Sequence, residues 1–272
     1  MALKEITSRQ NHFIKYAASL KERKNRDIEH SCIVEGRNLL KDMAGSDISL
    51  RFLFVSRSFY GKEGAGTLLE RLMQKAGRSF LIEDRLMEHL STTESSPGIL
   101  AVVETKAMGI EEAEVSKESF YLILDRLQDP GNLGTIFRTA SAFGVTGVIL
   151  FTPHVDPYNP KTVRASSGAI FTVPLYSAGN ADIPCIKEMK SKGMALFSTS
   201  SKGGHLLPEW PCTTPMAVIL GNESRGISPE LRQLADKEIR VPMKPAVESL
   251  NVSITAALIC YRSYELRFLA KR

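Results

Sequence analysis

The sequence predicts an α/β protein in which a mainly parallel sheet, flanked by helices, carries a ligand pocket along its carboxyl edge. Three stretches in the second half of the chain support this prediction. Each runs from apolar, strand-like residues through a polar turn into a helical pattern, at residues 125–134, 219–226 and 241–253. Because parallel strands end at the same edge of a sheet, three such turns in one domain indicate a single pocket there.

The first 105 residues alternate between helical and strand-like patterns, which is typical of a small α/β layer structure. The expected strands cover residues 31–35, 51–56, 79–82 and 98–103. The expected helices cover residues 11–20, 67–76 and 85–90, with a further helix through Leu39, Leu40 and Met43. We therefore expect a first domain over residues 1–105.

The alternation stops at residues 106–118, a glutamate-rich segment without a clear apolar face. Such a composition predicts a linker. The pattern restarts in residues 119–272, which we expect to form the second domain.

In the second domain the expected strands cover residues 120–124, 147–151, 195–199, 216–220 and 238–241. The expected helices cover residues 133–143, 162–170, 230–236 and 252–269. Gly144 is expected to end the first of these helices as a C-cap. Strands separated by helices favour a parallel sheet.

Composition restricts the class of protein. Of the 272 residues, 43% are hydrophobic and 24% charged, which is typical of a globular chain. We expect no membrane span, because no apolar run approaches roughly 20 residues. We expect a cytoplasmic location, because the N-terminus lacks the apolar core of a secretory signal. The net charge of +5 fits ordinary variation and a polyanionic partner equally well. The cysteines are dispersed without a C-x-x-C pair, so no metal site is expected.

The first turn carries two candidate functional residues. Asn132 follows Pro130 and Gly131 and is predicted to cap the next helix. In that helix Arg138 falls off the apolar stripe that contains Leu133. Periodicity leaves two interpretations of Arg138 open: a solvated arginine, or a guanidinium that faces a substrate phosphate or hydroxyl.

The second turn places Glu223 between Gly221 and Gly226, and glycines allow a ligand to approach the main chain. Glu223 could accept hydrogen bonds from a ligand or from Arg138. It could also stand near the next helix without a role, since Ser228 followed by a proline already suits the start of that helix.

The third turn is stiffened by two prolines and enters the last helix, where Ser249 or Asn251 is expected to supply the cap. A capping residue at the rim of a pocket can also contact a ligand. Ser249 and Asn251 are therefore candidates both for capping the helix and for contacting a ligand.

Together the three stretches resemble, in order and spacing, the sequence motifs of the SpoU (TrmH-like) family of the SPOUT methyltransferase superfamily. The N-terminal half, with residues 13–20, 33–36 and 39–40, is similar to the small ribosomal-protein-like substrate-binding domain often fused to these enzymes. The resemblance implies a C-terminal domain with a deep trefoil knot, which no pattern argument would predict. It also implies a homodimer through the knotted domain.

The same resemblance implies a reaction, the transfer of a methyl group from S-adenosylmethionine to a ribose 2′-hydroxyl of RNA. The protein must then orient the attack and help to remove the hydroxyl proton. Ribosomal RNA is expected, because family members with this N-terminal domain mostly act on ribosomes. The alternatives are a transfer-RNA methyltransferase and a catalytically idle RNA-binding protein of the same fold.

The resemblance further implies functional residues. Catalytic and positioning roles are implied for Asn132, Arg138, Glu223, Ser249 and Asn251. Cofactor contacts are implied for Thr199, Leu220, Gly221, Asn222, Val241, Met243, Leu250 and Asn251. Arginine stays protonated in proteins, with a pKa above about 12. Arg138 must therefore either lose a proton beside the cationic sulfonium or remain charged and stabilise the developing alkoxide.

Basic residues are expected to contact the RNA backbone. The candidates are Arg23, Lys24, Arg26, Arg37 and Arg164. A charge run is as often only a solvated face, and a structural role for Arg164 is about as plausible as a contact with RNA.

Overall fold

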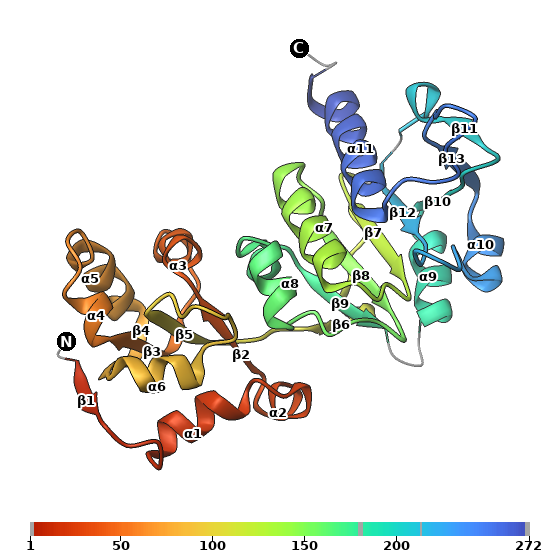
Figure 1. Ribbon diagram of the computed structural model, residues 1–272. Helices are drawn as coiled ribbons and strands as arrows, with labels where there is room; N and C mark the ends of the chain where they lie inside the picture. The colour runs from red at the N-terminus through yellow and green to blue at the C-terminus, as the bar shows by residue number, and fades with distance from the viewer. Residues whose placement is uncertain (1–2, 179–181, 213, 270–272) are drawn as a thin grey trace. The chain divides into compact units, whose positions relative to one another are not determined.

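The computed structural model describes residues 3–178, 182–212 and 214–269. Contacts between residues divide the chain into two compact units, shown in Figure 1. Residues 1–106 and 158–171 form the first unit, and residues 107–157 and 172–272 form the second. Among the described residues, no helix combines the length and apolarity needed to cross a membrane.

The first unit is built on a five-stranded sheet with strand order β1-β4-β3-β5-β2. The strands are β1 (Lys4–Ile6), β2 (Ser31–Glu35), β3 (Leu50–Ser56), β4 (Ala76–Ile82) and β5 (Ile99–Glu104). Strand β4 is parallel to β1 and β3, whereas β5 is antiparallel to β2 and β3. Apolar side chains of β3 and β4 pack against α1 and α6 in one core cluster.

The described part of the first unit has eight helical segments. They are α1 (His12–Ser19), α2 (Arg23–Glu29), α3 (Arg37–Ala44), α4 (Arg57–Tyr60), α5 (Gly66–Lys75), α6 (Asp84–Leu90), α8 (Pro160–Ala165) and the 3₁₀ turn η2 (Ala169–Phe171). The sequence did not predict α2, because its buried side chain is an arginine and no apolar stripe marks the helix.

The described residues of the second unit form an eight-stranded parallel sheet with order β11-β13-β10-β12-β7-β8-β9-β6. The strands are β6 (Met108–Gly109), β7 (Phe120–Asp125), β8 (Gly147–Phe151), β9 (Leu175–Ala178), β10 (Ala195–Thr199), β11 (His205–Leu206), β12 (Met216–Leu220) and β13 (Lys237–Arg240). The expected strands over residues 147–151, 195–199 and 216–220 are confirmed.

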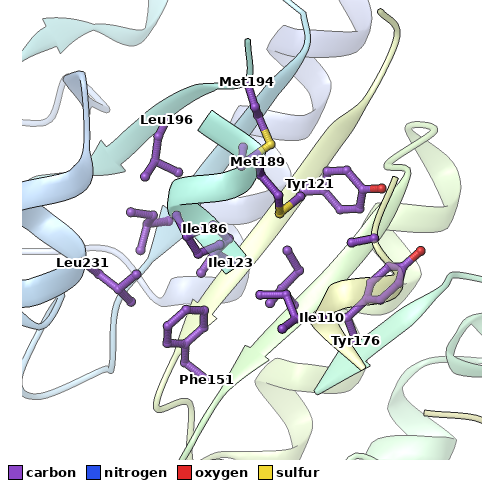
Figure 2. Close-up of a cluster of buried hydrophobic side chains, with 14 of the residues drawn as sticks. Ile110, Tyr121, Ile123, Phe151, Tyr176, Ile186, Met189, Met194, Leu196 and Leu231 are labelled. Atoms are coloured by element: carbon purple, nitrogen blue, oxygen red, sulfur yellow. The ribbon is translucent and has the colours of Figure 1, made fainter. Parts of the chain in front are cut away.

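The helices of the second unit cover both faces of this sheet. They are α7 (Pro130–Ala142), α9 (Asp182–Ser191), α10 (Pro229–Leu234) and α11 (Val252–Tyr264), with the short turns η1 (Ile110–Glu112), η3 (Leu207–Glu209) and η4 (Glu265–Leu269). Figure 2 shows the core on one face, where Ile186 and Met189 of α9 and Leu231 of α10 meet Tyr121 and Ile123 of β7. Helices α7 and α11 pack against each other on the opposite face (Figure 1).

The segment that was expected to be a linker is partly packed. Strand β6 pairs with β9, and Ile110 and Ala113 are buried in the cluster of Figure 2. From Ala107 onward this segment belongs to the second unit. Two apolar residues among many glutamates were too few to show as a stripe, so their burial was not predicted.

Helix α7 begins three residues earlier than predicted. The side chain of Asp129, and not that of Asn132, caps it by accepting a 2.7 Å hydrogen bond from the backbone N–H of Asn132. Pro130 occupies the first turn, where a missing N–H costs nothing. At the other end Gly144 adopts a positive φ of 63°, consistent with its predicted place at the helix C-terminus.

Candidate active site

A cavity of about 470 Å³ lies at the carboxyl ends of β10, β12 and β13 in the second unit. Thr199 ends β10, Leu220 ends β12, and Val241 directly follows β13. Helix α11 closes one wall with Thr255 and Ile259. Because these strands are parallel, the turns that follow them meet at one edge, as the sequence suggested.

Most of the residues expected at a ligand site line this cavity. The candidates for cofactor contacts found in its wall are Thr199, Leu220, Gly221, Asn222, Val241, Met243, Leu250 and Asn251. Glu223 and Ser249, which were expected to have catalytic or positioning roles, line it as well.

Asn132 connects the three turns. Because Asp129 caps α7, the side-chain amide of Asn132 is available for other bonds. Its Nδ2 donates to Oε1 of Glu223 at 3.0 Å, and its Oδ1 accepts from Nδ2 of Asn251 at 2.9 Å. A continuous cluster, Asn132–Glu223–Asn251, therefore joins the first, second and third turns beside the cavity.

Asn251 has two tasks in this arrangement. Its Oδ1 caps α11 by accepting from the backbone N–H of Ser253 at 2.8 Å, while its Nδ2 donates to Asn132. Asn251 thus holds the helix N-terminus in a fixed position relative to the first turn. Of the two predicted caps for α11, Asn251 is the one that forms, and Ser249 stays exposed on the cavity wall.

A buried carboxylate stabilises the first and second turns beside the cavity. Asp125, at the end of β7, accepts from Arg126 Nε at 3.0 Å and from the backbone N–H of Ser228 at 2.6 Å. Asn222 Nδ2 in turn donates to the Arg126 carbonyl at 2.8 Å. A buried charge must be paired in this way to be tolerated. No role was predicted for Asp125, although a carboxylate at the end of an apolar strand was a usable signal.

The loop after β12 is shaped by Gly221 and Asn222. A Cβ on Gly221 would lie 2.4 Å from the carbonyl carbon of Gly226, so only glycine fits. The Oδ1 of Asn222 accepts from the backbone N–H groups of Ser224 and Arg225, each at 3.0 Å. The side chain of Asn222 therefore organises the loop that borders the cavity.

Two cationic side chains of the cavity wall were not predicted. Arg232 of α10 lies 3.9 Å from Glu238, and Lys202 follows β10. Among the described residues, the ammonium group of Lys202 has no hydrogen-bond or ion-pair partner. No sequence signal distinguishes such a lysine from an ordinary surface lysine.

Arg138 does not line the cavity. It is exposed on α7, off the apolar stripe as predicted, and no described residue forms an ion pair with it. It lies about 120° around the helix from Asn132, given roughly 100° per residue. The hydrogen bond suggested from Arg138 to Glu223 does not form within the described part of the chain, and Glu223 accepts from Asn132 instead.

Two of the expected RNA contacts have structural roles. Arg26 is buried, and its Nη1 donates to the carbonyls of Leu20 and Lys21 at 2.7 and 2.6 Å, which corrects its placement on an RNA-facing surface. Arg164 donates to Thr92 Oγ1 at 2.9 Å and lies 3.3 Å from the buried Glu35 carboxylate. These contacts favour the structural interpretation of Arg164.

The other three expected RNA contacts are exposed. Arg23 pairs with Asp27 at 3.6 Å, and both of these side chains are more than half exposed. Arg37 donates to the Gly64 carbonyl at 3.1 Å, and Lys24 lies on the surface of α2. All three remain accessible to a polyanion.

Fold and site together define an α/β protein with a cavity of small-molecule size at the carboxyl edge of a parallel sheet. The chain belongs to the SpoU rRNA Methylase family, whose model matches residues 119–261. Residues 11–101 match a second model, the MRM3-like substrate binding domain.

The similarity to known relatives extends over nearly the whole chain. An uncharacterized tRNA/rRNA methyltransferase of Synechocystis is 30% identical over 95% of this chain and 92% of its own length. The 23S rRNA (guanosine(2553)-2′-O)-methyltransferase RlmP of Bacillus subtilis is 27% identical over 95% of this chain and 98% of its own. The structure of an AdoMet-bound rRNA methyltransferase from Sinorhizobium meliloti superposes with a TM-score of 0.85 at 25% identity, covering 98% of this chain and 99% of that one.

Proposed function

We propose that this protein is an S-adenosylmethionine-dependent methyltransferase that modifies a ribose 2′-hydroxyl in ribosomal RNA. The observation that carries the proposal is the cavity at the strand ends with the Asn132–Glu223–Asn251 cluster beside it. Its volume is within the roughly 300–1,000 Å³ of small-molecule sites. The named ribose methyltransferases among the relatives favour ribosomal RNA over transfer RNA.

The residues of the cavity fit this cofactor. Leu220, Val241 and Leu250 offer apolar surface to the adenine ring, and Gly221 allows close approach to the main chain. Lys202 offers a positive charge to the carboxylate of the methionine portion. When bound, the cofactor supplies an activated methyl group on a sulfonium.

The bonded cluster orients the reaction. Asn132 holds the Glu223 carboxylate at a fixed place on the rim, where it can accept a hydrogen bond from the substrate. Arg138 is exposed and has no ion-pair partner among the described residues, so it is free to bind RNA phosphate. We assign it the role of a permanently charged group that positions the backbone and stabilises the developing alkoxide.

A homodimer through the knotted domain is part of the proposal. Ile254, Leu258 and Tyr261 are 50%, 38% and 50% exposed and lie on one side of α11 at helical spacing. An exposed apolar stripe of this kind on a helix is suited to a self-complementary interface. Sedimentation of the protein and of a Leu258→Glu variant tests this, and a wild type that sediments as a monomer would contradict it.

The reaction itself is tested by methyl transfer. Labelled S-adenosylmethionine is incubated with the protein and total RNA from a strain that lacks it, and the modified nucleotide is mapped. Label in a ribose of ribosomal RNA is expected. Label in a base or in transfer RNA would contradict the assignment. Cofactor binding by calorimetry without any transfer would favour an idle RNA-binding protein.

A further inference from the structure

The first unit carries an exposed cluster of arginines and aromatic rings. This arginine–aromatic patch consists of Arg51, Arg78, His12, Phe13, Tyr16 and Phe52. It lies where α1 meets the amino-terminal ends of β3 and β4. None of its members was among the RNA contacts expected from the sequence.

The rings of the patch touch in a continuous series. His12 lies 3.8 Å from Phe13 between ring centroids, Phe13 lies 5.1 Å from Phe52, and Phe52 lies 5.7 Å from Tyr16. Phe13 belongs to the core, Tyr16 and Phe52 are half-buried, and His12 is exposed. The core is thus continuous with aromatic surface that reaches the solvent.

The guanidinium of Arg51 lies over this surface. Its guanidinium lies 5.1 Å from the ring centroid of Tyr16 and 5.8 Å from that of Phe52. Its Nη1 donates to Tyr16 Oη at 2.8 Å and to Ser31 Oγ at 3.3 Å. These neutral acceptors orient the guanidinium without neutralising its charge.

Arg78 adds a second cation on the neighbouring strand. It is paired in register with Phe52, and its guanidinium lies 5.1 Å from the Phe13 ring. The register of β3 with β5 shifts between Leu50 and Phe52. Such an irregularity changes the direction of the side chain of the residue within it, here Arg51. Among the described residues, neither arginine forms an ion pair with a carboxylate, and both are exposed.

We propose that the arginine–aromatic patch is a binding site for a single-stranded segment of RNA. The two guanidinium groups bind phosphates, and a base stacks on the exposed ring surface or on the plane of Arg51. This inference rests on the proposed function, since it takes RNA as the substrate. The aliphatic stems of arginines can also cover apolar rings, but coverage alone gives no reason for two neighbouring cations over aromatic rings without carboxylate partners.

Binding of the full-length protein to a fluorescein-labelled, ten-nucleotide single-stranded RNA tests this site. The double variant Arg51→Gln, Arg78→Gln is compared with Arg71→Gln, Arg85→Gln, which removes the same charge from exposed positions of the same unit. We expect the patch variant to raise the Kd about tenfold. We also expect the slope of log K against log salt to fall by about 1.4, at about 0.7 for each phosphate that is no longer neutralised. The control pair is expected to change both quantities much less.

A second variant, Phe52→Leu, keeps apolar packing and removes the ring. Weaker RNA binding, by about fivefold with an unchanged salt slope, is expected because the stacking surface is smaller. Thermal unfolding of each variant verifies that it is folded.

Equal Kd values for the patch and control pairs would overturn the site while leaving the methyltransferase proposal intact. An altered oligomeric state at unchanged RNA affinity would overturn it too, because the patch would then be a protein interface. A wild type that binds neither this RNA nor S-adenosylmethionine would refute the proposed function itself.

Discussion

The side-chain amide of Asn132 donates a 3.0 Å hydrogen bond to the carboxylate of Glu223, although 91 residues separate the two in the chain. Asn251, which lies 119 residues from Asn132 in the sequence, donates to the same amide. The rim of the cavity is therefore held by one amide that two distant turns share, and its geometry depends on that amide.

Replacing Asn132 tests this dependence. In Asn132→Ala both bonds are removed, but Glu223 is exposed, so water replaces the donor and unfolding free energy falls by less than about 1 kcal/mol. Methyl transfer, in contrast, is expected to fall about 100-fold, because small misplacements of positioning groups cost that much. Steady-state kinetics and thermal unfolding check the two parts. Equal losses of unfolding free energy and of transition-state stabilisation, both expressed in kcal/mol, would show that Asn132 only maintains the fold.

Arg138→Lys separates charge from geometry. The lysine keeps a positive charge but lacks the planar fork that binds phosphate in two places, so kcat/KM should fall about tenfold. In Arg138→Gln it should fall further, whereas thermal unfolding should change in neither variant, since Arg138 is exposed. Near-normal turnover of the lysine variant would exclude a role for the guanidinium fork.

Gly221→Ala is expected to damage the cofactor cavity. The added Cβ would lie 2.4 Å from the carbonyl carbon of Gly226 and 2.6 Å from the backbone nitrogen of Ile227, so the loop must shift. We expect a loss of about 1–3 kcal/mol in unfolding free energy and weaker S-adenosylmethionine binding in calorimetry. Gly66→Ala serves as the control, because a Cβ there meets nothing within 4 Å. Unchanged affinity in Gly221→Ala would place the cofactor elsewhere.

Lys202→Gln tests the proposed carboxylate contact. S-adenosylhomocysteine carries the carboxylate, whereas methylthioadenosine lacks it. The variant is expected to bind the first about fivefold more weakly and the second unchanged, with a smaller difference at high salt. Parallel titrations of both ligands supply the measurement. If both affinities fell together, Lys202 would act on the shape of the cavity and not on the carboxylate.

Asp236 is expected to make stability depend on acid pH. Burial opposes its charged form, but hydrogen bonds from Lys190 at 2.7 Å and from the backbone N–H of Leu196 at 2.8 Å outweigh that effect, and the pKa of Asp236 is lowered. A folded pKa below the unfolded value adds stability above about pH 4, and this stability is lost as the pH falls through the folded pKa. Urea unfolding of Asp236→Asn should therefore differ from wild type at pH 7 and converge with it at low pH. A constant difference across this range would contradict the assignment.

Local patterns predicted much of the fold. The strands β10 and β12 were expected with the boundaries that they have, because short apolar runs between polar turns are typical of buried parallel strands. Helix α2 and the packed residues after Ala107 were missed, since neither displays an apolar stripe. Asn132 was expected as a helix cap, yet Asp129 takes that place.

The sequence by itself determined the α/β alternation, the three polar turns and the residue types that they carry, because these follow from local periodicity and turn chemistry. Only the tertiary structure decided which side chains meet. It joined Asn132 to Glu223 and Asn251, turned Arg26 inward, and assembled Arg51 and Arg78 on aromatic rings. Such pairings depend on the packing of segments far apart in the chain, and periodicity within one segment carries no information about them.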